Sequence, residues 1–254
     1  MPALAASAPI LRLDEVGLDF VHEGAVVPVL RAVSLSVREG ELVCLIGRSG
    51  CGKSTLLKLV AGFLAPSRGQ CLLDGRRISH PGPDRCVVFQ EDALFPWLTV
   101  RENIGFGLRG PEWPRRRQEA EINRFLDLVG LGDHGDHLPR ALSGGMKQRV
   151  ALARVLIRSP RILLMDEPFG ALDAQAREEM QDLLLRLAQE RRQTILFVTH
   201  DVQEAVIVGD RVLLLDRDSG SIREEMTIDL ARPRDRAESR FHSLCARLHG
   251  WLRA

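Results

Sequence analysis

The sequence predicts an α/β fold in which a mostly parallel sheet is flanked by helices, with an N-terminal antiparallel β region and an inserted α-helical subdomain. Two observations carry this prediction. Short, continuous apolar runs alternate with helix-like segments after residue 158, as in sheets that are covered on both faces. Between residues 91 and 158 the apolar spacing is that of helices. With 254 residues, 45% of them hydrophobic, the chain can bury a large core.

Strand-like segments dominate the first 90 residues. Val33, Leu35 and Val37 alternate with other residues, which predicts a strand with one apolar face. The first segment is expected to expose one face to solvent, and the later segments to be buried. The predicted strands are 11–20, 32–37, 41–46, 70–73 (before an Asp74-Gly75 turn) and 86–89.

Helices follow in the middle of the chain. Thr99 and Glu102 have the spacing of a capping box at a helix start. A second helix is predicted over 116–129, where apolar residues recur at helical spacing before Gly130. After this insert, strands are predicted over 162–165, 194–198 and 211–215, and helices over about 174–190 and from Asp201.

Four polar or glycine positions each come just after a predicted strand: Gly47, Gln90, Asp166 and His200. Sheets of this kind bind ligands at the carboxyl ends of their strands. The sequence therefore predicts that these four segments converge on one crevice.

The chain is predicted to be a single domain over residues 1–254. Its core comprises 1–90 and 159–226, the helical subdomain is 91–158, and a C-terminal helical tail covers 227–254. The tail places apolar residues on one face of a helix, which favours docking on the body over membrane-surface binding or a dimer contact. The residues of this face are Phe241, Leu244, Leu248 and Trp251.

Charge and hydropathy exclude some classes of protein. The 35 Lys and Arg residues almost cancel the 34 Asp and Glu residues, so the net charge gives no argument for a nucleic-acid partner. No apolar run approaches the roughly 18 residues that span a bilayer, and residues 1–9 lack the basic flank of a signal peptide. We therefore expect a cytoplasmic location.

Five cysteines without a C-x-x-C pair argue against a disulfide framework and against a zinc site. Free thiols in a reducing compartment are expected. Asp133, His134, Asp136 and His137 have metal-ligand residue types, but a solvated loop explains them better. The run 115–117 of three arginines is best explained as a solvated helix start, with proximity to lipid headgroups as the lesser alternative.

A phosphate-binding loop lies between a predicted strand and a predicted helix. Residues 47–54 fit the pattern Gly-x4-Gly-Lys-Ser, the P-loop of nucleotide hydrolases. Lys53 would act as a point charge on the phosphates and Ser54 as a magnesium ligand, which predicts ATP and Mg²⁺ as cofactors. The predicted phosphate contacts are Gly47, Arg48, Ser49, Gly50, Cys51, Gly52, Lys53, Ser54 and Thr55.

Two adjacent carboxylates follow the apolar strand 162–165. Phosphoryl transfer needs one carboxylate to hold the magnesium shell and one to orient the attacking water and accept its proton. We assign Asp166 to the metal and Glu167 to the water. A solvated acidic turn is the alternative.

A second glycine-led helix start lies far downstream, at residues 142–148. Ser143 is a suitable N-cap, and Gly144 and Gly145 leave the backbone N–H groups bare. The P-loop can cradle a nucleotide's phosphates unaided, so this second helix start is expected to cap a nucleotide that another subunit holds.

The order of P-loop, Leu-Ser-Gly-Gly, Asp-Glu and His resembles the ATPase subunit of ABC transporters. The resemblance covers about residues 11–226 and implies roles for further residues. His200 would contact the γ-phosphate, and Gln90 would touch metal and water and link to the membrane partner. The family's signature sequence would include Gln148, and its D-loop at the dimer interface would include Asp173. A strand-end histidine and an ordinary polar cap are the alternatives for His200 and Gln90.

The family usually stacks adenine on a tyrosine before the P-loop, but this chain has no tyrosine. Phe20 is the best candidate because stacking needs only an aromatic face, with a core-facing Phe20 as the alternative. Residues 91–98 include Leu-Phe-Pro-Trp, which is similar to importers of the nitrate, sulfonate and taurine branch. This apolar stretch is either a groove for a permease helix or ordinary core.

The resemblance implies a peripheral ATPase at the cytoplasmic face of the cell membrane. Two copies would sandwich two ATP molecules head to tail and drive two transmembrane permease subunits, which an extracytoplasmic solute-binding protein supplies with solute. The alternatives are a soluble mechanochemical ATPase of the same family, the ATPase of an exporter, and a P-loop kinase. A kinase would leave residues 142–148 unexplained.

Overall fold

The computed structural model describes residues 8–22, 24–89, 94–108 and 113–253, and it confirms the predicted α/β class. The chain divides into two units. Unit 1 comprises Met1–Gly82 and Ala188–Ala254, and unit 2 comprises Pro83–Leu187. The boundary falls inside helix α5 (Ala174–Arg191).

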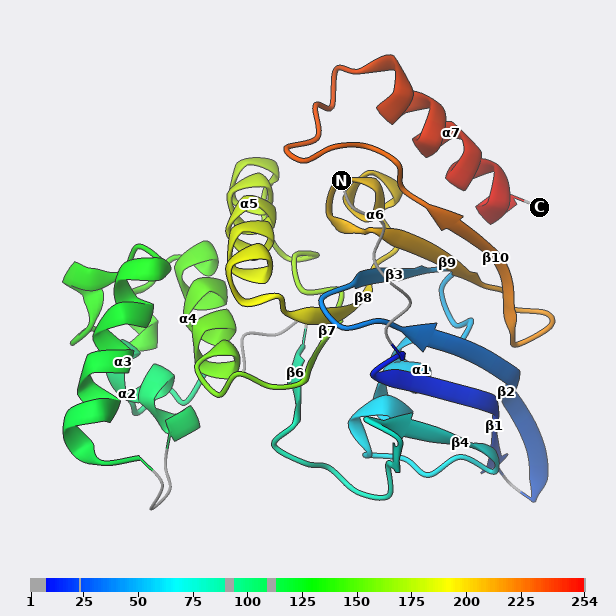
Figure 1. The fold of residues 1–254 in the computed structure, drawn as a ribbon, viewed down its shortest axis with the longest axis horizontal. Coiled ribbons are helices and arrows are strands. Elements are labelled where there is room, and N and C mark those ends of the chain that lie inside the picture. The colour runs from blue at the N-terminus through cyan, green and yellow to red at the C-terminus, as the bar shows by residue number, and fades with distance from the viewer. Residues whose placement is uncertain (1–7, 23, 90–93, 109–112, 254) are drawn as a thin grey trace. The chain divides into compact units, whose positions relative to one another are not determined.

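Unit 1 contains the predicted antiparallel region, which is a sheet of order β2-β1-β4-β5 (Figure 1). Its strands are β1 (Leu11–His22), β2 (Ala25–Val37), β4 (Arg68–Leu73) and β5 (Arg76–Arg77). Strand β2 begins seven residues before the predicted start. This first half is mostly exposed and does not alternate apolar with polar residues, so it carries no period-two signal.

The parallel sheet of unit 1 consists of β3 (Leu42–Ile46), β8 (Thr194–Val198), β9 (Arg211–Leu215) and β10 (Ile222–Thr227). Strand β3 runs parallel to both β8 and β9, and β10 pairs antiparallel with β9. Every residue of β3 and β8 is buried, as expected for a sheet covered on both faces. Strand β10 was not predicted, because its sequence Ile-Arg-Glu-Glu-Met-Thr is mostly polar.

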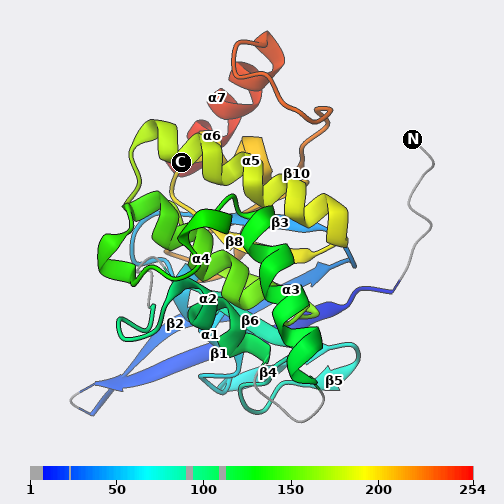
Figure 2. The same ribbon diagram turned by 90° about the vertical axis from the view of Figure 1, so that its left-hand side faces the viewer.

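Helices pack on both faces of this parallel sheet. Helix α1 (Lys53–Ala61) packs against β8, and α6 (Val202–Val208) packs against β3. Figures 1 and 2 show these two helices on opposite sides of the strands. Helix α7 (Ser239–Arg253) packs on α6, which confirms that the tail docks on the body.

The buried face of α7 differs slightly from the prediction. Phe241 and Leu248 are buried as expected, whereas Leu244 and Trp251 are half-buried. Cys245 completes the buried face instead. Its thiol is small and apolar enough to occupy a packed position.

Unit 2 contains the parallel pair β6 (Arg85–Val88) and β7 (Ile162–Asp166). Its helices are α2 (Val100–Gly105), α3 (Arg115–Leu128), α4 (Gly144–Leu156) and the first part of α5. Helix α2 packs against both α3 and α4, and Figure 2 shows the three side by side. Three short 3-10 turns, Phe106–Leu108, Gly132–His134 and Pro139–Ala141, connect them.

The predicted helix starts form as expected. Thr99 and Glu102 make both bonds of a capping box, since the Thr99 hydroxyl accepts from the Glu102 N–H at 3.2 Å and a Glu102 carboxylate oxygen accepts from the Thr99 N–H at 2.8 Å. Asp201 caps α6 by accepting from the N–H groups of Gln203 and Glu204.

The structure also describes the cysteines, the arginine run and the candidate metal ligands. All five cysteines are free thiols. Arg115, Arg116 and Arg117 are exposed at the start of α3. Across residues 8–253, apart from the undescribed gaps, no group of three or more His, Cys, Asp or Glu side chains is arranged to hold a metal. In the same part of the chain, no helix combines the length and apolar character needed to cross a membrane.

Candidate nucleotide-binding site

The P-loop connects β3 to α1 in unit 1, and close packing requires two of its glycines, Gly47 and Gly52. A Cβ at Gly47 would lie 2.5 Å from the Leu215 carbonyl oxygen and 2.6 Å from the Cys51 sulfur. Gly52 has a φ of +103°, and a Cβ there would lie 2.8 Å from Leu30. These positions exclude side chains, so the loop backbone can turn tightly into the helix.

Helix α1 starts in a way that favours an anion. Gly52 occupies the N-cap, and in the described chain no side chain bonds to the first turn as a cap. The first turn also has no acidic residue. The backbone N–H groups and the positive end of the helix dipole are therefore available to a phosphate.

Lys53 is buried in the loop, with only 6% of its surface exposed. Its ammonium group donates to the carbonyl oxygen of Gly47 at 2.9 Å and to that of Arg48 at 3.3 Å. The carbonyl groups of the loop therefore hold the Lys53 ammonium inside the P-loop. When a phosphate binds, its charged oxygens would replace these neutral carbonyl acceptors, and a charged acceptor bonds an ammonium more strongly.

The structure brings His200 to the same sheet edge as the P-loop. In the parallel register Leu45 of β3 lies opposite Val198 of β8, so Gly47 and His200 each follow the paired position by two residues. His200 is exposed, and it directly precedes the Asp201 cap of α6. The convergence predicted for these two segments is confirmed within unit 1.

Phe20 lies on β1 opposite Val27 of β2, and 41% of its surface is exposed. The alternative of a core-facing Phe20 is therefore wrong. Val21 and Val26, the next pair toward the hairpin end, are also exposed, at 74% and 65%. An exposed aromatic face with apolar neighbours is suited to stacking on a planar base.

Asp166 ends β7 in unit 2, and Glu167 follows it. Both side chains are half-buried. The backbone of Glu167 has a φ of +47°, in the left-handed region where a residue with a Cβ is strained. Such strain persists only where the surrounding structure fixes the backbone of the residue.

Gln90 lies outside the described residues, as do 91–93. Strand β6 ends at Val88, which pairs with Met165 of β7 in the parallel register. Val88 and Met165, which precede Gln90 and Glu167 by two residues each, are therefore neighbours.

Helix α4 starts as predicted, since the Ser143 hydroxyl caps it by accepting from the Met146 N–H at 3.3 Å. Among the described residues, none comes close enough to Gly144 or Gly145 to require a glycine there. A Cβ at Gly144 would lie 3.9 Å from its nearest described neighbour, on Leu172, and a Cβ at Gly145 would lie 3.6 Å from Ala176. Both distances are ordinary van der Waals contacts, and neither glycine has a positive φ.

Two further predicted site residues have structural partners in unit 2. Asp173 is exposed and caps α5, because its carboxylate accepts from the Ala176 N–H at 2.9 Å. Gln148 is 3% exposed, so its side chain lies within the unit. The N-cap role of Asp173 was not recognised in the sequence, although Asp is among the preferred N-cap residues.

The apolar stretch before α2 is only partly packed. Phe95 contacts the rings of Phe106 and Trp97, and the Arg154 guanidinium lies 5.3 Å from its ring centroid. Burial lowers the pKa of this arginine. Trp97, however, is 72% exposed. The interpretation of this stretch as ordinary core therefore accounts for Phe95 but not for the exposed Trp97.

Each unit, taken by itself, contains residue types that suit part of a magnesium nucleotide. Unit 1 provides backbone N–H groups at a bare helix start and the ammonium of Lys53, which suit a triphosphate. Hydroxyl and carboxylate oxygens, such as those of Ser54 and Asp166, are the ligands that Mg²⁺ prefers. The sequence did not reveal that the end of β9, at Leu215, forms a wall of the P-loop, because nothing local at Leu215 indicates this contact.

We predict that Cys51 reacts slowly with alkylating reagents and that its modification abolishes nucleotide binding. Burial raises the pKa of this thiol, which is 2% exposed, so little thiolate forms near neutral pH. An alkyl group also has no room beside Gly47. Mass spectrometry of each cysteine, with nucleotide binding measured on the same samples, tests this. A Cys51→Ala variant should keep binding after the same treatment, and full ATPase activity of protein modified at Cys51 would contradict the prediction.

Comparison with known proteins gives the family. The model of the family described as ABC transporter matches residues 30–170, which is more than half of the chain. The bicarbonate transport ATP-binding protein of Synechococcus elongatus is 48% identical over 216 residues, which cover 84% of this chain and 33% of that protein, so the chain spans about a third of its length. The nitrate import ATP-binding protein NrtD of Synechocystis sp. is 43% identical over 234 residues, covering 92% and 88%. An ATP-binding cassette solved as a dimer in a post-hydrolysis state with ADP and Pi aligns with a TM-score of 0.73 at 29% identity, covering 87% and 100%. The chain belongs to the ABC transporter family.

Proposed function

We propose that this chain is the ATP-hydrolysing subunit of an ABC import system, folded as one ABC ATPase domain and working as a head-to-tail homodimer. Two membrane permease subunits carry it at the cytoplasmic face of the cell membrane, and an extracytoplasmic solute-binding protein delivers the solute. Relatives named for nitrate import and bicarbonate transport support the import role. The related dimer with ADP and Pi supports hydrolysis. The formal net charge of +1 gives no support for a nucleic-acid partner.

The observation that carries this proposal is the pair of glycines at the start of α4. Glycine destabilises a helix by roughly 1 kcal/mol relative to alanine, and no described part of the chain needs the missing side chains of Gly144 and Gly145. The space is therefore kept for a molecule outside the chain. A bare, serine-capped helix start suits the γ-phosphate of a nucleotide that the partner subunit holds.

The nucleotide is held first by unit 1. The P-loop backbone from Gly47 to Thr55 surrounds the phosphates, and Lys53 moves its ammonium from its own loop carbonyls onto them. The adenine stacks on Phe20, whose exposed face is available for it. A phenylalanine offers no hydroxyl for hydrogen bonding, so weak selectivity among purine bases is expected at this position.

Hydrolysis depends on residues that follow the strands. Glu167 orients the attacking water and accepts its proton, and His200 contacts the γ-phosphate. Ser54, Gln90 and Asp166 hold Mg²⁺, which neutralises charge on the phosphates when bound. Each closed dimer opens after hydrolysis, since ATP stabilises closure only by contacts that both subunits make.

The permease side of the chain is the segment 90–98. Trp97, with 72% of its surface exposed, is a large apolar side chain next to a packed aromatic cluster. A permease helix covering it would bury this surface, as groove-binding helices do. Asp173, at the start of α5, lines the interface between the two copies.

The cargo is proposed to be a small oxyanion: nitrate, an aliphatic sulfonate such as taurine, or bicarbonate. The names of the relatives point to nitrate and bicarbonate, and the Leu94-Phe95-Pro96-Trp97 run points to the nitrate and sulfonate branch. The ATPase subunit meets ATP and the permease but not the solute, so its own residues cannot select the cargo.

Replacing Glu167 with Gln should preserve ATP binding and slow hydrolysis by about 100-fold or more, because the amide cannot accept the proton. Glutamine has nearly the same shape, so the strained backbone and the stability should be unchanged. Steady-state turnover and equilibrium ATP binding are the measurements. Glu190→Gln, the same change on the exposed face of α5, is the control. Near-normal turnover of Glu167→Gln would remove Glu167 from this role.

Replacing Gly145 with Ala should raise the free energy of unfolding by a few tenths to about 1 kcal/mol, because alanine is the better helix former. The same change should weaken ATP-dependent dimerisation by about 10-fold or more, because the methyl group occupies the space proposed for the partner's nucleotide. Chemical denaturation and sedimentation measure the two effects.

The matched control for that variant is Gly250→Ala in α7, where a Cβ would meet nothing within 4 Å. It should stabilise the chain in a similar way and leave dimerisation unchanged. Equal dimerisation of Gly145→Ala and the parent protein would contradict the sandwich model.

The cargo proposal predicts a growth defect. A strain that lacks this gene should grow poorly under at least one of three conditions. These are nitrate as the sole nitrogen source, taurine or another alkanesulfonate as the sole sulfur source, and limiting bicarbonate. The parent strain and a strain with the gene restored are the controls. Equal growth of mutant and parent under all three conditions would set the oxyanion proposal aside.

A further inference from the structure

Helix α6 is short, and its two ends are held by different parts of the chain. It spans only seven residues, Val202–Val208, and a helix of this length is not stable by itself in water. Asp201 caps its first turn, one residue after His200. The last four carbonyl groups of any helix have no partner within it, so the stability of α6 depends on what binds its C-terminal end.

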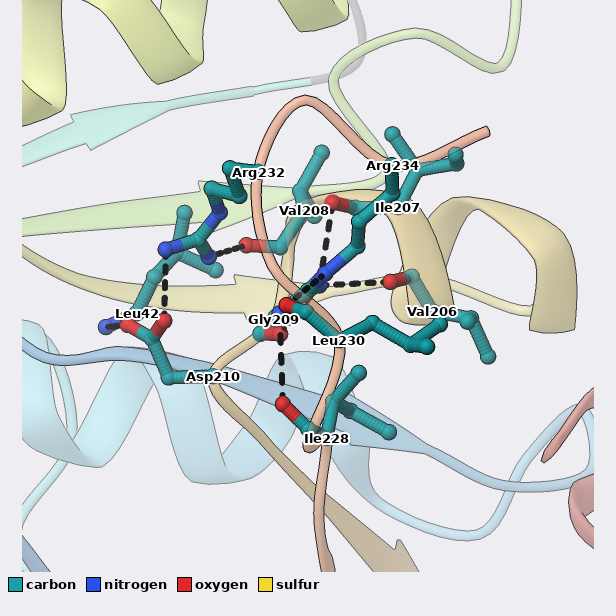
Figure 3. A network of polar contacts seen from close by, with 10 residues as sticks. All are labelled: Leu42, Val206, Ile207, Val208, Gly209, Asp210, Ile228, Leu230, Arg232 and Arg234. Carbon is teal, nitrogen blue, oxygen red and sulfur yellow. Dashed lines mark hydrogen bonds and ion pairs between the residues drawn. The ribbon is translucent and has the colours of Figure 1, made fainter. Parts of the chain in front are cut away.

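The tail provides those partners (Figure 3). Arg234 donates from one guanidinium nitrogen to the carbonyl oxygens of Val206 at 2.5 Å and Ile207 at 3.0 Å. Arg232 donates to that of Val208, and the remaining carbonyl, Ala205, accepts from the Gly209 N–H at 3.0 Å. All four orphan carbonyls of α6 are therefore satisfied, two of them by Arg234.

Arg234 also ties α6 to the chain that follows it. The same nitrogen donates to the Gly209 carbonyl at 2.6 Å, and other nitrogens donate to Leu230 at 3.2 Å and Ile228 at 3.4 Å. The planar fork of a guanidinium can bind several carbonyls at once, which a lysine ammonium on its flexible stem does less well. Desolvation by burial, followed by the nearby Arg232, lowers the pKa of Arg234 to about 10, so the group stays charged near neutral pH. A cation at the C-terminal end of a helix complements its dipole.

A second set of contacts connects the same tail to the strand that leads into the P-loop. One carboxylate oxygen of Asp210 accepts from Arg232 at 2.6 Å, and the other accepts from the N–H of Leu42, the first residue of β3, at 2.9 Å. At Gly209 a Cβ would lie 2.8 Å from the Ala205 carbonyl oxygen and 2.9 Å from the Cys44 sulfur. The end of α6 is thus packed tightly on β3, and the tail is bound to both through Arg232 and Asp210.

We propose that Arg234 is a positioning residue for hydrolysis: by binding the C-terminal end of α6 it fixes this helix, and through the Asp201 cap it fixes His200 at the edge of the sheet. This inference rests on the role proposed for His200 at the γ-phosphate. Arg234 lies at the opposite end of α6 from His200, so it acts through the helix and does not touch the nucleotide. Misplacement of a reacting group by about 1 Å can cost on the order of 100-fold in rate, so a frayed α6 should be visible in turnover.

The test uses the full chain with Arg234→Ala and Arg234→Lys. Arg234→Ala should lower kcat about 10-fold or more while the Kd for ATP stays within about 2-fold, because the P-loop is intact. Amide hydrogen exchange in peptides that cover 202–209 should become faster. Arg234→Lys keeps the charge but reaches fewer carbonyls, so its kcat should lie between those of Arg234→Ala and the parent. If Arg234→Ala does not fold, Arg234→Lys carries the test by the same two measurements.

The control is Arg240→Ala, which removes an exposed arginine of the same tail that pairs only loosely, at 3.5 Å, with Asp229. It should leave kcat and exchange unchanged. A double mutant with His200→Ala separates positioning from general stability, since the loss caused by Arg234→Ala should largely disappear when there is no imidazole to position.

Two kinds of result would overturn the inference. The first contradicts only the positioning role of Arg234, and the second also contradicts the role proposed for His200. If His200→Ala lowers kcat but Arg234→Ala and Arg234→Lys match the parent, or if the two losses are additive, the positioning role fails alone. If His200→Ala hydrolyses ATP at the parent rate, the role proposed for His200 fails and the positioning role fails with it.

Discussion

The parallel pairing of β3 with β8 determines where unit 1 presents its functional groups. Parallel strands end at the same edge of a sheet, so the residues that follow Ile46 and Val198 emerge next to one another. The P-loop and His200 are these residues. Both strands are completely buried, so a change in their pairing would disturb close packing on both faces of the sheet. The position of the chemistry therefore follows from apolar packing in the core.

Two pairs of glycines near helix starts differ in what fills the space beside them. At Gly47 and Gly52 the chain itself occupies that space, with the Leu215 carbonyl and the Leu30 side chain. At Gly144 and Gly145 no described atom comes closer than ordinary contact. A sequence pattern cannot separate the two groups, because each reads as glycine near a helix start. The structure separates them, because only at Gly144 and Gly145 is the space beside the glycine free of close described atoms.

The sequence predicted the central elements well, for a physical reason. Strands β8 and β9 have their predicted bounds, because buried apolar runs with polar ends give a strong signal. The exposed half of β2 and the polar edge strand β10 were missed, since their hydrogen bonds are not accompanied by burial. Among the site residues, the motifs located the P-loop, His200 and the start of α4. The arginines of the tail could not be found in this way, because their partners are backbone carbonyls, which every residue has.

The helix ends of this chain use charge in two different ways. Helices α2 and α6 have an acidic residue in the first turn and a side-chain cap, and their starts are thereby completed within the chain. Helices α1 and α4 have no acidic residue there, and a carboxylate at either start would repel a phosphate. Lack of an acid is not sufficient evidence by itself, since α3 also lacks one and begins with three arginines. What distinguishes α1 and α4 is that bare glycines accompany the missing acid. At the other end of α6, Arg234 of the tail complements the helix dipole, so the helix that follows His200 has side-chain partners at both ends. The two helices proposed to meet phosphate have no acidic side chain in their first turns.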